Sequence, residues 1–367
     1  MFLRHAFTTA AASLGIAAFI AATGLAAIAP AHAAGPTNDK PKGWTDASVD
    51  CKAVGLSKPP PWTIGVSNYG LSNSWRVQMI AELKAAAAKD TRIKALLITN
   101  ADGNIAKQVS DIEDLLTRNV DGLLITPLTP DGLNGPLQDA SDDKVPTILF
   151  NDRVNGNKFT GIIWADEYKF GWIGGEWLKE KLGGHGQIVM LDGIPGTVVN
   201  DLRAQGAIDA MGPGIKILAR QPGAWAYDKG KAAMEDLISA YPKIDGVYSQ
   251  GGAMSQGAID ALLAAKRPLV PMPGEGYNGF LKTWYYNKSK GFSAIAPDDP
   301  TWQSSAALGL LTQCLAGGTI QKWKELPIPT ITDATVGQYV RTDCPDDVWA
   351  NTKMSRDEIT KLYHCKG

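Results

Sequence analysis

The sequence predicts an α/β fold with two doubly wound parallel-sheet lobes, and three observations lead to this prediction. From Trp62 onward, short continuous apolar runs alternate with longer amphipathic stretches. Continuous apolar runs are typical of parallel strands that helices cover on both faces. The alternation repeats with the same rhythm in two halves, roughly residues 62–165 and 166–295. The chain of 367 residues is also longer than the ~250–300 residues at which a single core usually divides.

Each predicted element follows from its local pattern. The strands are the apolar runs, and the helices are the amphipathic stretches between them. The predicted strands cover residues 62–67, 95–99, 122–126, 147–150, 188–191, 215–219, 246–249, 269–272 and 292–296. The predicted helices cover residues 74–89, 105–119, 170–182, 198–211, 228–241, 254–265 and 302–316.

Residues 1–33 are predicted to be a cleavable signal peptide. Arg4 gives a positive start, residues 6–29 are rich in Ala, Leu, Ile and Phe, and Ala31-His32-Ala33 matches a small-x-small cleavage site. The alternative is a transmembrane anchor, but Thr and Ser residues dilute the apolar stretch and the cleavage site favours removal. No Cys follows the apolar stretch, so we expect no lipid anchor and no stable membrane anchor. Residues 34–61 then form a Pro-rich N-terminal extension.

Composition and charge exclude several classes of protein. Hydrophobic residues make up 44% and charged residues 20%, which excludes a disordered, collagen-like or coiled-coil chain. The formal net charge is −1 and there is no basic stripe, so no nucleic-acid partner is expected. The chain has only four histidines, one of them near each terminus, so no metal site built from histidines is expected.

The four cysteines are Cys51, Cys314, Cys344 and Cys365. An even number of cysteines in an exported chain predicts up to two disulfides. Three pairings are possible, and the sequence does not choose among them. Cys51 lies in the extension, and Cys344 and Cys365 lie in a C-terminal tail of residues 344–367, so we expect the bridges to fix loose ends. The absence of a CxxC pair argues against a redox or zinc motif.

Polar and aromatic residues follow the predicted strands. Ligands of open parallel sheets bind at the carboxyl ends of the strands, so these residues are the candidate site. Amides, carboxylates and the planar fork of Arg hydrogen-bond hydroxyl groups, and Trp faces offer apolar walls to a sugar ring. Two lobes that close over such residues would trap a small polar ligand. The strand-end residues include Tyr69, Asn73, Trp75, Arg76, Asn104, Asn151, Asp152, Arg153, Trp164, Arg203, Trp225, Gln250, Glu275 and residues 297–302.

Each candidate also has a purely structural interpretation. Asp152 and Arg153 could form a surface ion pair, which contributes little to stability. Arg203 could serve solubility alone, and Glu275 could complement a helix dipole. The tryptophans could fill the lobe cores. Their shared position at strand ends favours ligand contact.

Motifs for catalysis are weak or absent. Residues 274–279 match GxGxxG, but they belong to a late βα unit, and no acidic residue ends a strand about 20 positions further on. A nicotinamide cofactor is therefore not expected. GxSxG, P-loop, HExxH and EF-hand motifs are all absent. We predict a binding protein without a cofactor or metal, and not an enzyme.

Several short segments in a fixed order carry a resemblance to a known family. They are IGVS at 64–67, NSWR at 73–76, NIAKQ at 104–108, VDGLLITP at 120–127, NDR at 151–153, and GIPGT at 193–197 with Arg203. Over about residues 62–330, the chain resembles the periplasmic sugar-binding proteins of the ribose/galactose type. These are the solute receptors of ABC importers.

The resemblance implies two lobes joined by a three-stranded hinge, the type I periplasmic binding fold. The crossings are expected near Ala165, Pro297 and Leu326. The N-terminal lobe would comprise residues 62–165 plus 298–326, and the C-terminal lobe residues 166–297 plus 327–343. The family's sugar contacts, carried over by position, fall on Asn73, Trp75, Asn104, Asp152, Arg153, Arg203, Trp225 and the neighbourhood of Ala165.

Three positions depart from the family pattern. Gly251 stands where family members often have Asn, Gly276 where they have Asp, and Pro297 where they have Gln. Trp164 and Trp302 add bulk nearby. With these departures, ordinary ribose or galactose is not expected, and a sugar alcohol, a deoxy or modified sugar, or a different small polar molecule fits as well.

The predicted function is that of a periplasmic solute-binding protein of an ABC importer. It would act as a monomer, capture a monosaccharide, sugar alcohol or modified sugar between the lobes, and deliver it to an inner-membrane permease. The alternatives are a ligand-sensing receptor subunit for chemotaxis or a sensor kinase, and then an exported NAD-linked enzyme. The predicted ligand-binding residues are Asn73, Trp75, Arg76, Asn104, Asp152, Arg153, Trp164, Arg203, Trp225, Gln250, Glu275 and Trp302.

Overall fold

The structure, a computed structural model, describes residues 47–366. The predicted signal peptide and the first part of the N-terminal extension lie outside the described residues. Within residues 47–366, no helix combines the length and the apolar character that crossing a bilayer would require.

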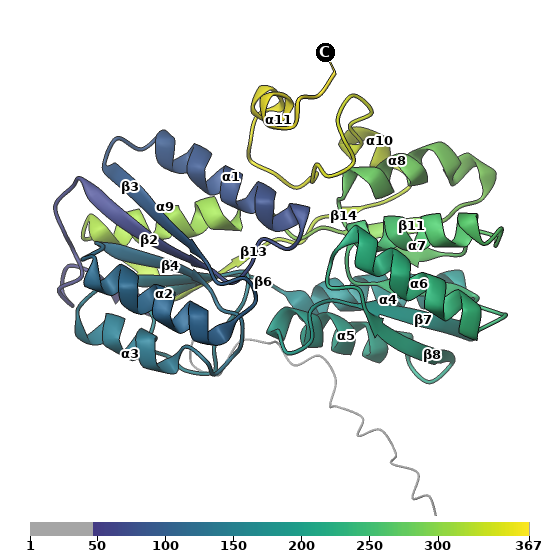
Figure 1. Ribbon diagram of the computed structural model, residues 1–367, viewed down its shortest axis with the longest axis horizontal. Helices are drawn as coiled ribbons and strands as arrows, with labels where there is room; N and C mark the ends of the chain where they lie inside the picture. The colour runs from purple at the N-terminus through teal and green to yellow at the C-terminus, as the bar shows by residue number, and fades with distance from the viewer. Residues whose placement is uncertain (1–46, 367) are drawn as a thin grey trace, which may run out of the picture. The chain divides into compact units, whose positions relative to one another are not determined.

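A six-stranded parallel sheet forms the first half of the fold, in the order β13-β6-β5-β4-β2-β3. Helices α1 (Ser74–Ala88) and α9 (Gln303–Leu315) pack together on this sheet, and α2 (Ile105–Thr117) packs with α3 (Asn134–Asp142) (Figure 1). The strands are β2 (Trp62–Asn68), β3 (Ile93–Asn100), β4 (Gly122–Thr126), β5 (Thr147–Phe150), β6 (Gly161–Ala165) and β13 (Trp323–Leu326).

The strands of this sheet direct apolar side chains to both of its faces, and a hydrophobic core forms on each face. Successive side chains of a strand point to opposite faces. In β4, Leu124 joins the core that contains Met79 of α1 and Leu311 of α9. Its neighbours Leu123 and Ile125 join the core of α2 and α3. Helices therefore cover both faces, as the continuous apolar strands predict.

The second half of the fold contains two three-stranded sheets. Strands β8, β7 and β9 are parallel, and β10 is parallel to β11, which pairs antiparallel with β14. The backbone amide of Val247 donates to the Pro271 carbonyl at 3.1 Å, which joins β9 to the segment before β10. These strands are β7 (Gly186–Asp192), β8 (Ile215–Pro222), β9 (Gly246–Ser249), β10 (Met272–Pro273), β11 (Ala294–Pro297) and β14 (Thr330–Ile331).

Five helices and one 3₁₀ turn accompany the second half within the described residues. They are α4 (Glu167–Lys181), α5 (Val198–Met211), α6 (Tyr227–Ala240), α7 (Gly252–Ala264), α8 (Asn278–Asn287) and the turn η1 (Lys288–Lys290). Helix α4 packs along α5, and α6 packs along α7.

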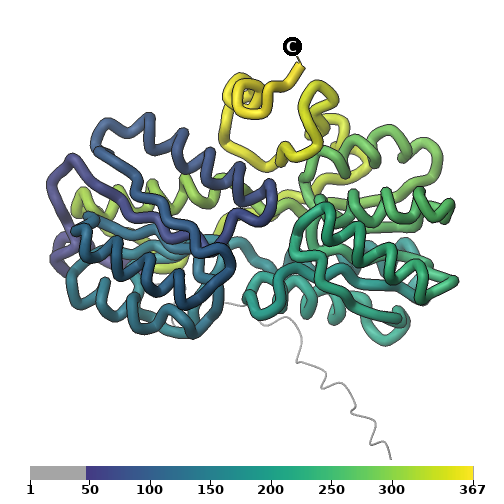
Figure 2. The backbone as a smooth tube through the Cα atoms, viewed as in Figure 1, coloured from purple at the N-terminus to yellow at the C-terminus, as the bar shows by residue number. Residues whose placement is uncertain are grey.

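The chain passes between the two halves three times. It leaves β6 after Ala165 and enters α4. It returns after β11 to form α9 and β13 on the first sheet, and it then leaves β13 for β14. The tube in Figure 2 follows these passages by colour. The carboxyl ends of the strands in each half carry the loops that start the following helices.

The two ends of the described chain are held by disulfides. Strand β1 (Ser48–Asp50) pairs antiparallel with β12 (Thr319–Gln321), and Cys51 is bonded to Cys314. Beyond β14 come α10 (Val336–Tyr339) and α11 (Arg356–Tyr363), and Cys344 is bonded to Cys365. The structure thus selects one of the three pairings that the sequence left open.

The predicted fold class is confirmed, with differences in single elements. Strands β4, β5 and β9 and helix α5 have the predicted bounds. The strand predicted at 269–272 is reduced to two residues, because prolines at 268, 271 and 273 remove ladder donors. Several elements were not predicted from the sequence, and these are β1, β6, β12, β13, β14, α3, α8, α10 and α11.

Removal of the Cys51–Cys314 bridge should destabilise the protein. The bridge joins residues 263 positions apart, so the variant Cys51→Ser/Cys314→Ser gains chain entropy in its unfolded state. We expect the free energy of unfolding to fall by about 2–5 kcal/mol, measured by urea denaturation of the mature protein. An unchanged denaturation midpoint would contradict this account.

Candidate functional site

A cavity lies where loops from both halves of the fold meet at the carboxyl ends of the strands. Its empty volume, open mouth included, is about 360 Å³, which falls in the range of small-molecule sites. Aromatic rings, arginines, carboxylates and amides line it together. The lining residues are Tyr69, Asn73, Trp75, Arg76, Asn151, Val199, Arg203, Trp225, Glu275, Asp299 and Trp349.

Arg203 is the buried cation of the cavity, and three carboxylates surround it. Its Nε atom donates to Glu167 Oε2 at 2.6 Å. Its Nη1 atom lies 3.5 Å from Glu275 Oε1, and its Nη2 atom lies 3.5 Å from Asp299 Oδ2. The guanidinium also stacks 3.6 Å from the centre of the Phe170 ring. Only 3% of Arg203 is exposed, so each of these partners compensates a charge that water does not reach.

Close packing of α4 on α5 brings Glu167 to Arg203. Gly171 of α4 faces the Arg203 carbonyl so closely that a Cβ atom there would lie 2.0 Å from the oxygen. Any larger residue at position 171 would push the helices apart. Thr197 starts α5 by accepting a hydrogen bond from the Asn200 amide. Glu167, the first residue of α4, therefore meets Arg203, which lies in the second turn of α5.

Burial raises the pKa of the carboxyl groups around Arg203. It raises the pKa of Glu167 to about 8 and that of Glu275 to about 7, against the opposing charge of Arg203 in both cases. It raises the pKa of Asp299 to about 8, again opposed by Arg203. Asp298, which accepts from the Gly276 amide, has its pKa raised well above its usual range by burial and by the charge of Glu275.

Arg76 and Tyr69 form the opposite wall. The Arg76 guanidinium lies 3.5 Å from the centre of the Tyr69 ring. Its Nη1 atom donates to Asn68 Oδ1 at 2.9 Å, and its Nη2 atom donates to Asn151 Oδ1. Asn73 starts α1 by accepting from the Arg76 amide, so one turn of helix carries Asn73, Trp75 and Arg76 to the cavity.

Trp225 occupies a strained position over two glycines. Its φ angle is +55°, in the left-handed region that few non-glycine residues adopt. A Cβ atom on Gly193 would lie 2.1 Å from the Trp225 ring, and one on Gly251 would lie 2.9 Å from it. The two glycines thus create the space that the ring fills. Asn151, which also lines the cavity, has a φ of +65°.

Two of the three departures from the family pattern, at Gly251 and Gly276, have a structural explanation. At Gly251 a side chain would displace Trp225, and at Gly276 a Cβ atom would lie 2.4 Å from Asp298 Oδ2. Small residues at both positions therefore allow a large ring and a buried carboxylate to approach. Glu275 and Asp299 supply acceptor groups to the cavity near those positions.

Six of the twelve predicted ligand-binding residues line the cavity, namely Asn73, Trp75, Arg76, Arg203, Trp225 and Glu275. Asp152 and Arg153 follow the lining residue Asn151 without lining the cavity themselves. Asp152 is buried, and burial raises its pKa to about 8 against the charge of Arg76.

The other four predicted residues lie outside the cavity. Asn104 is exposed, and its side chain accepts from the Lys107 amide at the start of α2. Trp164 packs on Trp323 in the core of the first half, with 5.7 Å between ring centres. The side-chain amide of Gln250 donates to Asp192 and to the Asn200 carbonyl. Trp302 donates to Asn351, and Lys353 covers its ring.

Five lining residues were not among the twelve. Tyr69, Asn151 and Asp299 do follow predicted strands, and that position was the available signal. Val199 lies in the first turn of α5, where an apolar residue gives no signal. Trp349 lies in the C-terminal tail, far in sequence from every other lining residue, and no local pattern points to it.

The GxGxxG segment is covered by the C-terminal tail. The amides of Asn278 and Gly279 donate to the carbonyls of Val348 and Asp346 at 2.8 and 3.0 Å. These are amides at the start of α8, where a dinucleotide pyrophosphate would bind. A side-chain amide hydrogen of Asn278 is also donated to the Pro345 carbonyl at 2.7 Å. The arrangement therefore does not fit a nicotinamide cofactor.

This chain is similar to a known protein family and to several characterised proteins. Residues 64–319 match the family described as periplasmic binding protein domain. The ribose import binding protein of Bacillus subtilis is 24% identical over 283 residues, which cover 74% of this chain and 91% of the relative. The xylitol-binding protein of Mycolicibacterium smegmatis is 28% identical over 281 residues, which cover 74% of this chain and 78% of the relative. A crystal structure of an ABC transporter solute-binding protein from Thermobispora bispora has the same fold, with a TM-score of 0.74 and 24% identity over 84% of this chain and 95% of that one.

The buried carboxyl groups predict that ligand-free protein loses stability as the pH rises. Their folded-state pKa values of about 7 to 8 exceed the values of ~4 in an unfolded chain, so the folded state binds more protons between these limits. The contribution of these carboxyl groups to the free energy of unfolding is therefore fully present at low pH. It is lost as the pH rises through about 7 to 8. Calorimetric melting temperatures should fall between about pH 5 and pH 9, and less steeply in Glu275→Gln. A melting temperature that stayed level or rose would be inconsistent with buried, proton-binding carboxyl groups.

Proposed function

Because this chain belongs to the periplasmic binding protein family, we propose that it acts as the solute-binding protein of an ABC importer. The ligand is a small hydroxylated molecule, namely a monosaccharide, a sugar alcohol or a modified sugar. The single observation that carries this proposal is the cavity, where four aromatic rings and paired charged groups face one space. Relatives whose names refer to ribose and xylitol support the ligand class.

The cavity offers two kinds of interaction to such a ligand. Trp75, Trp225 and Tyr69 present apolar faces on which the C–H faces of a ring or a polyol chain pack. Glu275 and Asp299 accept hydrogen bonds from hydroxyl groups, and Asn73 both accepts and donates. The Trp225 Nε1 atom is buried and has no hydrogen-bond partner within residues 47–366, so a ligand oxygen would satisfy it.

We assign the lobes as residues 62–165 plus 298–326 and residues 166–297 plus 327–343. Lining residues from both groups support this assignment, since Asn73 and Asn151 come from one, and Arg203 and Trp225 from the other. A ligand that contacts both lobes favours the closed state, because it binds that state more tightly than the open one. Closure also excludes water, which strengthens the hydrogen bonds within the cavity.

The proposed role implies a location for the protein in the cell and a protein partner. The mature protein is exported to the periplasm after removal of residues 1–33, and it works there as a monomer without a cofactor. The closed form docks on an inner-membrane permease, which takes up the ligand. The protein performs no chemistry on the ligand.

A thermal-shift panel on refolded, ligand-free mature protein tests the ligand class. We expect at least one pentose, hexose or polyol to raise the melting temperature, because a ligand at 100 times its Kd adds about 2.7 kcal/mol of stability. Nicotinamide cofactors serve as the negative control. If no hydroxylated ligand raised the melting temperature while another solute class did, the proposed ligand would be wrong.

Replacement of Trp225 by Ala tests the assignment of the cavity. The variant loses a ring face and an N–H donor, and we expect ligand affinity to fall by roughly 2 kcal/mol, or about 30-fold. Isothermal titration calorimetry measures this with the best ligand of the panel. Trp172→Ala is the matched control, because Trp172 is partly buried on α4, donates to Glu176 and does not line the cavity. Equal affinities of the two variants would place the ligand elsewhere.

A further inference from the structure

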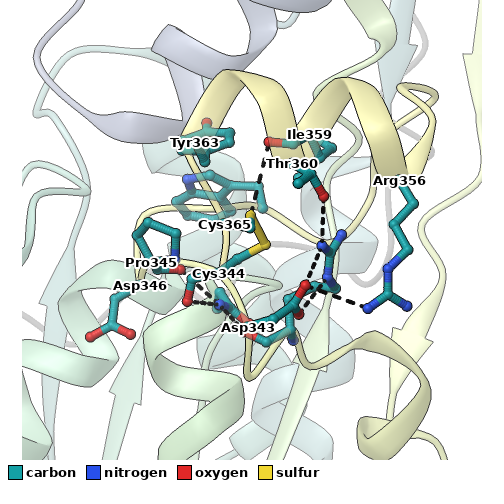
Figure 3. Close-up of a disulfide and its surroundings, with 12 residues drawn as sticks. Asp343, Cys344, Pro345, Asp346, Arg356, Ile359, Thr360, Tyr363 and Cys365 are labelled. Carbon is teal, nitrogen blue, oxygen red and sulfur yellow. Dashed lines mark hydrogen bonds and ion pairs between the residues drawn. A yellow bond between two sulfur atoms is a disulfide. The ribbon is translucent and has the colours of Figure 1, made fainter. Parts of the chain in front are cut away.

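A disulfide-bounded segment at the C-terminal end of the described chain lies outside the matched family region. We define the C-terminal loop as residues 344–365, the segment between the two bonded cysteines. The family match ends at residue 319. Figure 3 shows the Cys344–Cys365 bond beneath α11, with Tyr363 beside it. Arg341 fixes the base of the loop by donating to Asp343 at 2.7 Å and to Thr360 at 3.1 Å.

One side of the loop is bonded to the second half of the fold. Trp349 forms an antiparallel bridge with Tyr277, and their ring centres lie 5.5 Å apart. The Ala350 amide donates to the Gly276 carbonyl at 2.9 Å. The Lys282 ammonium donates to the Cys344 carbonyl at 2.6 Å. The loop therefore extends the structure around the start of α8.

The other side of the loop is bonded to α1 of the first half. The Gln78 side chain donates to the Trp349 carbonyl at 3.0 Å and accepts from its amide at 2.9 Å. Glu82 accepts from the hydroxyl of Thr352 and from the amides of Lys353 and Met354. Gln78 and Glu82 are both buried, so these bonds are shielded from water.

Trp349 is the residue at which the two sets of contacts meet. Its backbone is bonded to Gln78 on one side, and it bridges to Tyr277 on the other. Its Nε1 atom donates to Ser74 Oγ at 2.9 Å, next to the lining residues Asn73 and Trp75. Trp349 lines the cavity and is only 2% exposed. The loop thus delivers one large aromatic face to the site and fixes that face from both halves of the fold.

We propose that Trp349 contacts the ligand and determines specificity, and that the Cys344–Cys365 disulfide positions it. This inference rests on the proposed function, since it assigns a wall of the same cavity. Trp349 comes from the C-terminal loop and not from either sheet-bearing half of the fold. Its side chain would limit the size of the ligand that the cavity accepts. Without the disulfide, the two ends of the loop separate and binding has to order the loop again, which weakens affinity.

The experiment compares two tryptophan variants and two disulfide variants of the full mature chain. Calorimetric titrations use D-ribose, xylitol and myo-inositol as probes. In Trp349→Phe, we expect at least tenfold weaker binding of the best probe and a changed order of preference among the three. In Cys344→Ser/Cys365→Ser, we expect weakening of at least fivefold.

The controls separate binding from stability. Trp284→Phe changes a fully buried tryptophan that donates to Asp333 and does not line the cavity. Cys51→Ser/Cys314→Ser removes the disulfide that lies away from the cavity. Both controls should melt at lower temperature while keeping wild-type affinity. If affinity followed melting temperature equally in all four variants, Trp349 would be a structural residue and the proposal would be wrong.

Hydrogen exchange distinguishes failure of this proposal from failure of the proposed function. If wild-type protein bound neither these three probes nor any other sugar or polyol of the thermal-shift panel, the proposed ligand class would fail. Hydrogen exchange of the ligand-free protein would then still test the role of the disulfide. Faster exchange at the Trp349 and Met354 amides in Cys344→Ser/Cys365→Ser, with unchanged exchange in β4, would support positioning of Trp349 by the disulfide. Unchanged exchange at these amides would overturn it.

Discussion

A single buried cation organises the structure around the cavity. Arg203 lies in α5, and its carboxylate partners come from the start of α4, the loop after β10 and the passage after β11. An unpaired charge at a site with 3% exposure would be strongly destabilising, so these segments are constrained to meet at the guanidinium. Two of them, at Glu167 and Asp299, are the segments by which the chain passes between the halves. The charge cluster therefore holds together the part of the fold where a ligand would cause the lobes to close.

Close packing around this cluster leaves no room for larger side chains at several glycine positions. Gly171 allows the helices that carry Glu167 and Arg203 to touch, and Gly193 and Gly251 make room for the Trp225 ring. Two of the non-glycine residues with a positive φ angle, Trp225 and Asn151, line the cavity. Such strain persists only where surrounding contacts fix it, and it concentrates at functional sites. The same region thus combines buried charge, close packing and strained backbone, which is the expected signature of a preformed binding site.

The sequence predicted those parts of the fold that depend on local pattern. Strand β4 is buried along its length and is flanked by turns, so its apolar run is unambiguous. The run Gly161–Ala165, which forms β6, is also apolar and buried along its length, but it is absent from the predicted strands. By contrast, β13 and β14 are short strands, and β13 exposes its middle residues, so its pairing with β6 depends on the rest of the fold. The pattern of Ser355 followed by Glu358 is typical of a capping box, so the start of α11 could also have been predicted from the sequence.

The site was predictable to the extent that it lies at strand ends. That rule and the family resemblance found Arg203, Trp225 and Glu275, but position alone does not tell which way a side chain points. Asn104 and Gln250 satisfy the rule, yet Asn104 caps a helix and the Gln250 side chain bonds the end of β7 and the start of α5. Trp349 could not be found in this way, because its place at the cavity depends on contacts with Ser74, Gln78 and Tyr277, all distant in the sequence.

In the proposed function, the cavity holds one small hydroxylated ligand. Native mass spectrometry of mature protein, exported by cells and purified without denaturation, can detect this ligand without any choice of compound beforehand. We expect a bound mass equal to one monosaccharide or polyol, which disappears after unfolding and refolding and is absent from Trp225→Ala. A bound solute without hydroxyl groups, or a sugar retained equally by that variant, would contradict it.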